Sequence, residues 1–328
     1  MIFASMLWVA GAAVSCPASV PGRLVGTNYG GYLVPRELSE WLRARKDQPL
    51  LVYSFGLGLD VSFDLGIASQ LNALGYSNVA VHQFDPTPRA IKFVRAVRIA
   101  LREGVVGPAR DRAIRKAGTE LAPHDADKLA STLEWAVGSG ATSRVIPQQL
   151  QHHNWGLSTG ANETSARFYL PGDARCVSAT SMAPRTARGC GGMHPSRYFT
   201  ATLRSLEATV ARLGHDASRD ALHTMPGPHV LKIDVEGAEI QVLQALLAST
   251  LRPRLLCVDF DSLISAHTAY NRTGARAAIM QLHAAGYVPL DVRDDPRLAT
   301  LLKGHESLPE RSFVYCGDTD IPGVEIQR

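Results

Sequence analysis

A short apolar run that breaks into two glycines constrains the fold of this chain most strongly. Residues 50–55 are typical of a buried strand, and Gly56 and Gly58 follow them one residue apart. Apolar residues then recur at helical spacing from 61 to 74. A strand, a glycine turn and a helix in this order predict the first unit of a nucleotide-binding α/β domain.

The glycine turn suits a ligand for two reasons. Glycine has no Cβ, so the backbone at Gly56 and Gly58 can approach a ligand closely. The helix that follows offers unpaired N–H groups at its N-terminus, and Asp60 stands where it could cap that helix. We count Gly56, Gly58 and Asp60 as candidate cofactor-binding residues. A tight connection without a ligand is the alternative.

The next strand adds a candidate for the ribose of a cofactor. The run 79–84 is typical of a strand and ends at Asp85, where nucleotide-binding sheets carry the acid that binds ribose hydroxyls. A dinucleotide fingerprint would place a third glycine at position 61, where this chain has Val61, and would place its acid only about 20 residues after the glycines. The sequence therefore favours S-adenosyl-L-methionine, which has no pyrophosphate, over a nicotinamide cofactor.

Two acids follow a later strand-like run and are the candidate catalytic residues. Residues 229–233 are mostly apolar and lead to Asp234, and Glu236 follows two residues later. Because ligands bind outside the carboxyl ends of strands in open α/β sheets, we expect Asp234 to orient or deprotonate the acceptor. We expect Glu236 to support the substrate or cofactor side. The alternative is that both acids only cap the following helix.

No metal site is assigned from the sequence. Asp234 together with Asp259 or Asp261 could offer oxygen ligands for Mg²⁺, but the spacing does not require an ion. The neighbouring residues His152 and His153 also resemble a ligand pair. In an extended segment they would point to opposite faces, so we expect exposed loop histidines rather than a shared ion.

Strand-like and helix-like segments alternate from residue 50 to residue 316. This alternation predicts a mostly parallel, doubly wound α/β sheet with helices on both faces. We divide the chain into an N-terminal apolar segment, 1–25, and one domain, 26–328, with a helical insertion at about 89–145.

The second half of the chain contains four further expected elements. They are a loop at 172–197, a helix at 198–213, and two strands at 286–290 and 312–316. A polar connection joins the two strands, so we expect them to close one edge of the sheet as an antiparallel pair.

The composition excludes some classes of partner and site. A net charge of +4 is too small to indicate a nucleic-acid-binding surface. The five cysteines contain no C-x-x-C spacing, so we expect neither a zinc site nor a disulfide framework. Cys257 and Cys316 lie in apolar strand-like runs, and we expect both to be buried free thiols.

The apolar run 2–14 is a candidate targeting or anchor segment. It is too short to span a bilayer, and no Lys or Arg precedes it as in most signal peptides. We therefore expect no clear membrane span and favour the cytoplasm. A secretory or membrane-associated location through residues 2–16 stays open, as does the oligomeric state.

Several of these segments resemble one protein family. The segment 231–239 resembles the signature of the FkbM-type S-adenosyl-L-methionine-dependent methyltransferases. Residues 53–58, 62–64 and 84–88 resemble the cofactor motifs of that family, and the turn at 30–35 resembles an entry motif in relatives of methyltransferase-like protein 24. The resemblance extends over about residues 26–316.

The resemblance implies a Rossmann-like class I methyltransferase, with a mostly parallel seven-stranded sheet and one antiparallel edge strand. It also implies that Trp155 and Gly156 lie near the adenine. With the motifs above, it leads us to expect an S-adenosyl-L-methionine-dependent methyltransferase that methylates a hydroxyl of a small molecule or sugar. A non-catalytic S-adenosyl-L-methionine-binding protein on the same fold is the alternative, and a nicotinamide-dependent dehydrogenase is less favoured.

Overall fold

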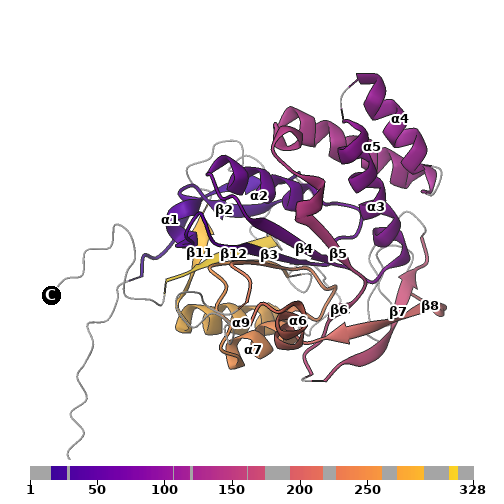
Figure 1. Ribbon diagram of the computed structural model, residues 1–328. Helices are drawn as coiled ribbons and strands as arrows, with labels where there is room; N and C mark the ends of the chain where they lie inside the picture. Colours follow the sequence, from indigo (N-terminus) through magenta and orange to yellow (C-terminus); the bar gives the residue numbers. More distant parts are fainter. Residues whose placement is uncertain are drawn as a thin grey trace, which may run out of the picture.

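The computed structural model describes residues 16–27, 30–105, 107–118, 121–160, 162–173, 193–216, 227–260, 272–291 and 310–316. At its centre lies a sheet in the order β2-β1-β11-β12-β10-β9-β3-β4-β5 (Figure 1). Its strands are β1 (Val20–Val25), β2 (Tyr32–Pro35), β3 (Leu50–Phe55), β4 (Val79–Phe84), β5 (Leu150–His153), β9 (Val230–Ile233), β10 (Leu255–Asp259), β11 (Tyr287–Asp291) and β12 (Glu310–Tyr315).

Parallel pairing dominates this sheet, as the alternation of strands and helices predicts. β10, β9, β3, β4 and β5 are parallel neighbours, and β1 is parallel to β11. Two features differ from the seven-stranded sheet with one antiparallel edge strand. The sheet has nine strands in the described residues, and antiparallel β12 lies inside it, between β10 and β11.

The two additional strands come from the segment before β3. β1 lies within the residues that we assigned to the N-terminal apolar segment, and its Pro21 and Gly22 weaken the strand pattern in the sequence. β2 pairs with β1 in antiparallel fashion at the end of the sheet. β11 and β12 form the expected antiparallel pair, but β1 and β2 extend the sheet beyond them, so the pair does not form the edge.

Helices cover both faces of the sheet, which confirms the doubly wound arrangement (Figure 1). One face carries α1 (Leu38–Leu42), α2 (Ser62–Ala73), α3 (Pro88–Glu103) and α5 (Pro123–Gly138), and the other carries α6 (Leu206–Leu213), α7 (Glu239–Ala248) and α9 (Arg272–Ala284). Each face has its own apolar core. Val52 of β3 belongs to the first core and Tyr53 to the second, because successive side chains of a strand point to opposite faces.

A group of helices occupies the expected insertion between β4 and β5. It consists of α3, α4 (Gly107–Gly118) and α5, and the C-cap of α3 is Gly104, where φ is 117°. Leu129 and Leu133 of α5 are fully buried in the core on the α2 face. This packing places α5 in the same layer as the helix that follows the glycine turn.

A second sheet of three strands, β6 (Gly156–Leu157), β8 (Met193–Arg204) and β7 (Thr164–Pro171), follows β5 in the chain. The prediction of a helix over 198–213 is therefore wrong in its first part, since only Leu206–Leu213 is helical. Phe199 pairs with Phe168 and Tyr198 with Tyr169 across β8 and β7. Such aromatic cross-strand pairs favour a strand over a helix. Residues 193–197 of the expected loop also belong to β8.

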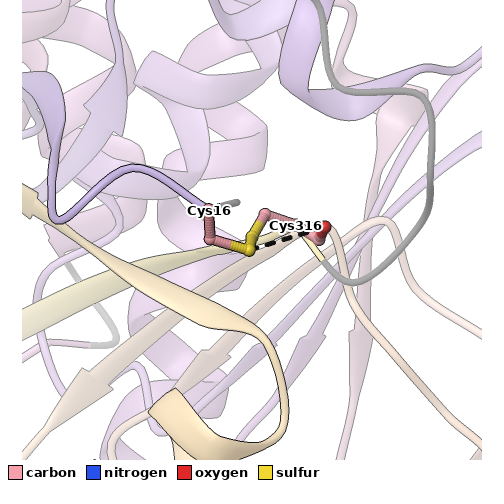
Figure 2. Close-up of a disulfide and its surroundings, with 2 residues drawn as sticks. All are labelled: Cys16 and Cys316. Atoms are coloured by element: carbon pink, nitrogen blue, oxygen red, sulfur yellow. Dashed lines mark hydrogen bonds between the residues drawn. A yellow bond between two sulfur atoms is a disulfide. The ribbon is translucent and has the colours of Figure 1, made fainter. Parts of the chain in front are cut away.

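A disulfide bond joins Cys16, before β1, to Cys316, after β12 (Figure 2). The expectations of a free thiol at Cys316 and of no disulfide are therefore wrong, whereas Cys257 is buried and free as expected. The bonded residues are separated by 300 positions, so no local spacing could indicate their pairing. The sheet order brings them together, because β1 and β12 both pair with β11.

Three expectations fall outside the described residues. They concern the apolar run 2–14, residues 174–192 of the expected loop, and Asp261. Within the described ranges, no helix combines the length and the apolar character needed to cross a membrane.

Candidate functional site

The order of the strands reverses beside β3. From β3 the chain continues to β4 and β5 on one side, and it later returns to β9 and β10 on the other. In open α/β sheets a ligand binds at such a switch point, outside the carboxyl ends of the strands. Gly56 follows β3, Asp85 follows β4 and Asp234 follows β9, so the fold gathers three predicted site residues at this point.

The backbone at Asp234, directly after β9, leaves room only for a glycine at position 56. The φ of Gly56 is 73°, and a Cβ at this position would lie 1.6 Å from the carbonyl oxygen of Asp234. Its N–H donates to the carbonyl oxygen of Phe84 at 2.9 Å, which fixes the turn to β4 as well. Gly58 also has a positive φ, of 54°. At Gly56, therefore, the close approach that glycine permits is an approach to the chain after β9.

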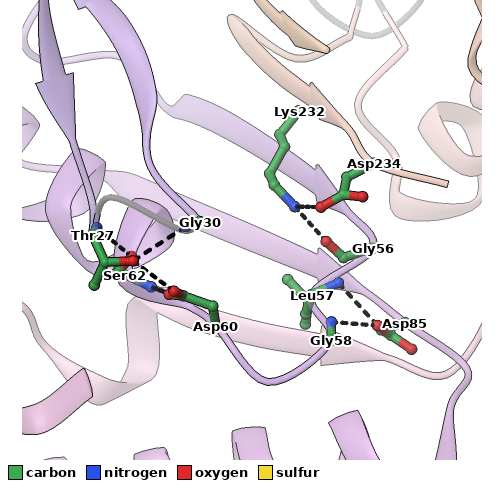
Figure 3. Close-up of polar contacts among 10 residues, drawn as sticks. All are labelled: Thr27, Gly30, Gly56, Leu57, Gly58, Asp60, Ser62, Asp85, Lys232 and Asp234. Carbon is green, nitrogen blue, oxygen red and sulfur yellow. Dashed lines mark hydrogen bonds and ion pairs between the residues drawn. The ribbon is translucent and has the colours of Figure 1, made fainter. Parts of the chain in front are cut away.

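Asp85 is bonded to the backbone of the glycine turn. Its Oδ2 accepts the N–H groups of Leu57 and Gly58 at 2.9 and 3.0 Å (Figure 3). Its Oδ1 accepts the N–H of Thr87 at 2.8 Å. Only 4% of Asp85 is exposed. The carboxylate therefore joins the turn to the start of α3, and two N–H groups of the turn are already occupied by it.

Asp60 lies in a separate polar group from the other site acids (Figure 3). Its carboxylate accepts the N–H of Ser62 and the hydroxyl of Thr27, each at 2.7 Å. The N-cap of α2 is Val61 rather than Asp60, because the helix begins at Ser62. Asp60 nevertheless binds an N–H of the first helical turn, so its carboxylate stabilises the start of α2 from one residue further back.

Asp234 is paired with a buried lysine that sequence interpretation missed. The Lys232 ammonium lies 3.0 Å from Asp234 Oδ2 and also donates to the carbonyl oxygen of Gly56 (Figure 3). Only 4% of the Lys232 side chain is exposed, against 30% of the Asp234 side chain. Lys232 thus fixes one oxygen of a carboxylate that is otherwise open at the switch point. A lysine inside the apolar run of β9 is the signal that could have revealed this pair.

A second acid, Asp64 of α2, also acts on Lys232. Asp64 is fully buried; burial raises its pKa to about 6, although the charge of Lys232 opposes the shift. Burial by itself lowers the pKa of Lys232, but Asp234 and Asp64 outweigh it and the net shift is upward. Buried Ser54 and Gln83 also lower the pKa of Asp64, although none of their contacts with it meets hydrogen-bond geometry. One buried cation is therefore stabilised by Asp234 and Asp64, and Asp259 adds to the upward shift.

Glu236 has a backbone conformation that is unusual for a residue with a side chain. Its φ is 52°, in the left-handed region, and Gly237 follows with a φ of 103°. The Gly237 N–H donates to Glu239 Oε1 at 2.7 Å, which closes the turn into α7. Strain of this kind costs about 1–3 kcal/mol and is found preferentially at functional sites. A role of Glu236 in binding or catalysis stays a prediction.

Trp155 and Gly156 follow β5 and are packed against other residues. The Arg204 guanidinium lies 4.4 Å from the centre of the Trp155 ring, and 8% of Trp155 is exposed. A Cβ on Gly156 would lie 2.7 Å from the Leu203 side chain and 3.6 Å from Pro86. Since Pro86 directly follows Asp85, Gly156 lies beside the ribose candidate. Contact of these two residues with an adenine stays a prediction.

A cluster of histidines lies among β3, β4 and β5. His82 Nδ1 is 3.0 Å from His153 Nε2, and the Tyr53 hydroxyl is 2.6 Å from His215 Nδ1. Burial lowers the pKa of His82 to about 3 and that of His153 to about 4, and it also lowers the pKa of His215. The expectation of exposed loop histidines is wrong, because His152 and His153 belong to β5 and are partly buried.

The described residues of the site contribute carboxylates and backbone groups. Among the residues that the structure places, no group of three or more His, Cys, Asp or Glu side chains could hold a metal ion. Asp85 and Asp234 flank the glycine turn, and Glu236 follows in the strained turn. Such a set of acids suits a ligand that carries positive charge and hydroxyl groups.

Comparison with protein-family models matches residues 117–289 to the methyltransferase FkbM domain. The matched region is more than half of the 328 residues. It includes Trp155, Gly156, Asp234 and Glu236, while the glycine turn and Asp85 precede it. No curated protein and no solved structure matches the chain. From the family match, the chain belongs to the FkbM methyltransferase family.

Proposed function

We propose that this protein is an S-adenosyl-L-methionine-dependent methyltransferase that transfers a methyl group to a hydroxyl oxygen of a small molecule or sugar. Membership of the FkbM family supports methyl transfer. The observation that carries the proposal is the switch point, where Asp85 and Asp234 follow the two strands that flank β3 and its glycine turn.

The strand order supports a Rossmann-like class I methyltransferase fold. Seven strands, β5-β4-β3-β9-β10-β12-β11, are consecutive in the sheet, and β12 is the antiparallel member of this block. We assign the block to the seven-stranded sheet of that fold. β1 and β2 are then additions specific to the N-terminal part of this chain.

The residues at the switch point suit the cofactor by their chemistry. Gly56 and Gly58 would face its methionine part, and Asp85 would hold its ribose hydroxyls. Asp85 Oδ1 accepts one backbone N–H, from Thr87, and a carboxylate oxygen has two lone pairs, so one is left for a hydroxyl. When bound, the cofactor supplies a methyl group that its sulfonium already activates.

Asp234 is the group that we assign to the acceptor. Because Lys232 binds Oδ2, the other oxygen of the partly exposed carboxylate is left to accept the hydrogen bond of the acceptor hydroxyl. Positioning the acceptor in line with the methyl donor is the main requirement of the reaction. Removal of the hydroxyl proton by Asp234 would add about 10²–10⁴-fold. Glu236 would support the substrate or cofactor side.

Calorimetric titration tests the cofactor first. We expect the purified full chain to bind S-adenosyl-L-methionine and its demethylated product S-adenosyl-L-homocysteine, and not to bind NAD. Binding of NAD without binding of S-adenosyl-L-methionine would contradict the proposal and favour a dehydrogenase.

Transfer of labelled methyl groups then tests catalysis. The wild-type chain is incubated with methyl-labelled cofactor and pools of sugars and hydroxyl-bearing metabolites, and Asp234→Asn serves as the matched variant. We expect label in at least one pool with the wild type and a much smaller amount with the variant. Cofactor binding without transfer to any pool would favour the non-catalytic alternative.

A further inference from the structure

The disulfide fastens an N-terminal hairpin, which consists of β1 and β2, to the central sheet. Cys316 is fully buried, and its N–H donates to the carbonyl oxygen of Gly286 at 2.8 Å. Cys16 lies just before β1, and the two Cα atoms are 6.1 Å apart, within the usual range for a disulfide (Figure 2). The bond therefore ties the start of the hairpin to a well-anchored point of the sheet.

The other end of the hairpin contacts the residues that follow the glycine turn. Thr27, between β1 and β2, donates its N–H to Ser62 Oγ at 2.8 Å and its hydroxyl to Asp60 Oδ2 at 2.7 Å (Figure 3). Gly30 fits closely against the same acid, since a Cβ on it would lie 2.6 Å from the carboxyl carbon of Asp60. The hairpin therefore supports Asp60 and the start of α2, which lie directly after Gly56 and Gly58.

The disulfide also restricts where the protein can mature. Disulfides form and persist in oxidising compartments and are rare in the cytosol. The apolar run 2–14 ends just before Cys16, and its length fits the hydrophobic region of a signal peptide. The covalent bond carries the inference about the compartment. The length of the run agrees with it, although no Lys or Arg precedes the run.

We propose that this chain matures in an oxidising compartment of the secretory type, where the Cys16–Cys316 bond holds the N-terminal hairpin against Asp60 and the start of α2. Bond formation joins the two Sγ atoms and releases two protons and two electrons to a disulfide oxidant, such as oxidised glutathione or a protein disulfide. This location replaces the cytoplasm that the sequence alone favoured. The proposal about the disulfide, the hairpin and the compartment does not depend on the proposed function. Only the expected effect on cofactor binding rests on the proposed function.

Mapping of the crosslink tests the bond and the compartment together. The full chain, with its own N-terminal residues, is produced in cells that have a secretory pathway, and its peptides are mapped without reduction. We expect a linked Cys16–Cys316 peptide in a fraction that membranes protect from added protease. Cytosolic protein with both thiols free would overturn the proposal. Cys257→Ala is the matched control, because Cys257 is buried and free and the crosslink should form without it.

Reduction of the folded protein tests the hold on the hairpin. A phosphine reductant should increase amide hydrogen exchange in residues 20–35 and leave α7 unchanged. Cys16→Ser and Cys316→Ser should each lower the melting temperature by about 5 °C or more, and the double variant should lose no more than either, since each removes the same bond. Unchanged exchange in β1 and β2 after reduction would overturn the proposed hold, even where a variant fails to fold.

Cofactor titration before and after reduction separates this proposal from the proposed function. We expect reduction to weaken binding of S-adenosyl-L-methionine several-fold, because Asp60 and the start of α2 lose the support of the hairpin. If the oxidised protein binds no cofactor, the proposed function fails, while crosslink mapping and hydrogen exchange still decide this proposal.

Discussion

Asp85 and Asp234 follow the two strands that flank β3, yet their surroundings differ. Asp85 is 4% exposed and accepts three backbone N–H groups. Asp234 has a 30% exposed side chain and is held by the ammonium of Lys232. The first carboxylate fixes the backbone of the glycine turn, and the second is fixed by a charge and stays open. Equivalent positions at the switch point therefore do not imply equivalent roles.

Removal of Lys232 should lower the stability of the fold more than any other change, because Asp234 and Asp64 both lose their cation. Asp85, which backbone N–H groups hold, is not affected by it. Lys232→Met keeps the length of the side chain but leaves the fully buried Asp64 and the partly exposed Asp234 without their cation. An acid left buried without its cation costs about 3–5 kcal/mol. We expect the free energy of unfolding, measured in denaturant, to fall by that amount. The exposed Lys92→Met control should change it by less than about 0.5 kcal/mol. Equal losses in both variants would contradict the buried pair.

Loss of the Asp234 charge should affect turnover more than folding. Asp234→Asn keeps the shape of the side chain but cannot take the acceptor proton, so we expect methyl transfer to slow by about 10²-fold or more. The assay is transfer of labelled methyl groups, and the exposed Asp127→Asn is the control. If turnover stays within a few-fold of wild type, Asp234 is structural, and the base has to be sought among Glu236, Asp259 and Asp261.

Relief of the strained turn at Glu236 should raise stability, by less than the loss of Lys232 lowers it. Glycine adopts the left-handed conformation of Glu236 without the penalty of a Cβ, whereas alanine keeps that penalty. We expect Glu236→Gly to be about 1 kcal/mol more stable than Glu236→Ala by denaturant unfolding. Both variants lack the carboxylate, so they should share any loss of activity. Equal stability would show that the turn carries no strain.

The region around β4 and β5, which leads to Asp85, should lose stability in acid, unlike the region around Asp64 and Lys232. Burial lowers the pKa of His82 to about 3 and that of His153 to about 4, both below the ordinary value of 6.5. Between these values the unfolded chain binds more protons than the folded one, so stability is lost as the pH falls from about 6.5. Asp64 has the opposite sign: its pKa is raised to about 6, so its contribution is lost as the pH rises toward that value.

Thermal melts at pH 7 and pH 5 measure this difference. We expect the wild type to melt at a lower temperature at pH 5, and His82→Phe, which keeps an aromatic ring in β4, to show a smaller decrease. The exposed His283→Gln control should decrease as much as the wild type. A wild-type melting temperature that does not fall between pH 7 and pH 5 would refute the role of the histidine cluster.

Local patterns predicted the part of the site that lies within one βαβ unit. β3 and β4 begin and end at the predicted residues, and α2 is within one residue of the prediction at each end. These elements follow from apolar periodicity and glycine, which act over a few residues. For the same reason Asp85 and Asp234 were correctly placed at strand ends, where the switch point brings them near each other.

Contacts between distant segments could not be predicted in the same way. Asp85 has one local partner, the N–H of Thr87, but its other two donors, Leu57 and Gly58, lie 28 and 27 positions back, across the glycine turn. The charge of Lys232 acts on Asp64 across 168 positions, because β9 returns beside β3. Cys16 is bonded to Cys316 because β1 pairs with β11. Likewise β8 is a strand because β7 pairs with it, although its sequence also permits a helix. Each of these features depends on pairing that no short pattern records.

The cofactor dissociation constant of two variants tests the central claim most directly. Asp85→Ala removes charge-assisted bonds to the glycine turn and to the ribose, each worth about 1.5–3 kcal/mol, so we expect affinity for S-adenosyl-L-methionine to fall at least about tenfold. Asp234→Asn should bind the cofactor nearly as the wild type does. Calorimetry on both variants, with melting curves to confirm folding, gives the comparison. Unchanged affinity in folded Asp85→Ala, or a larger loss in Asp234→Asn, would contradict the division of roles between the two acids.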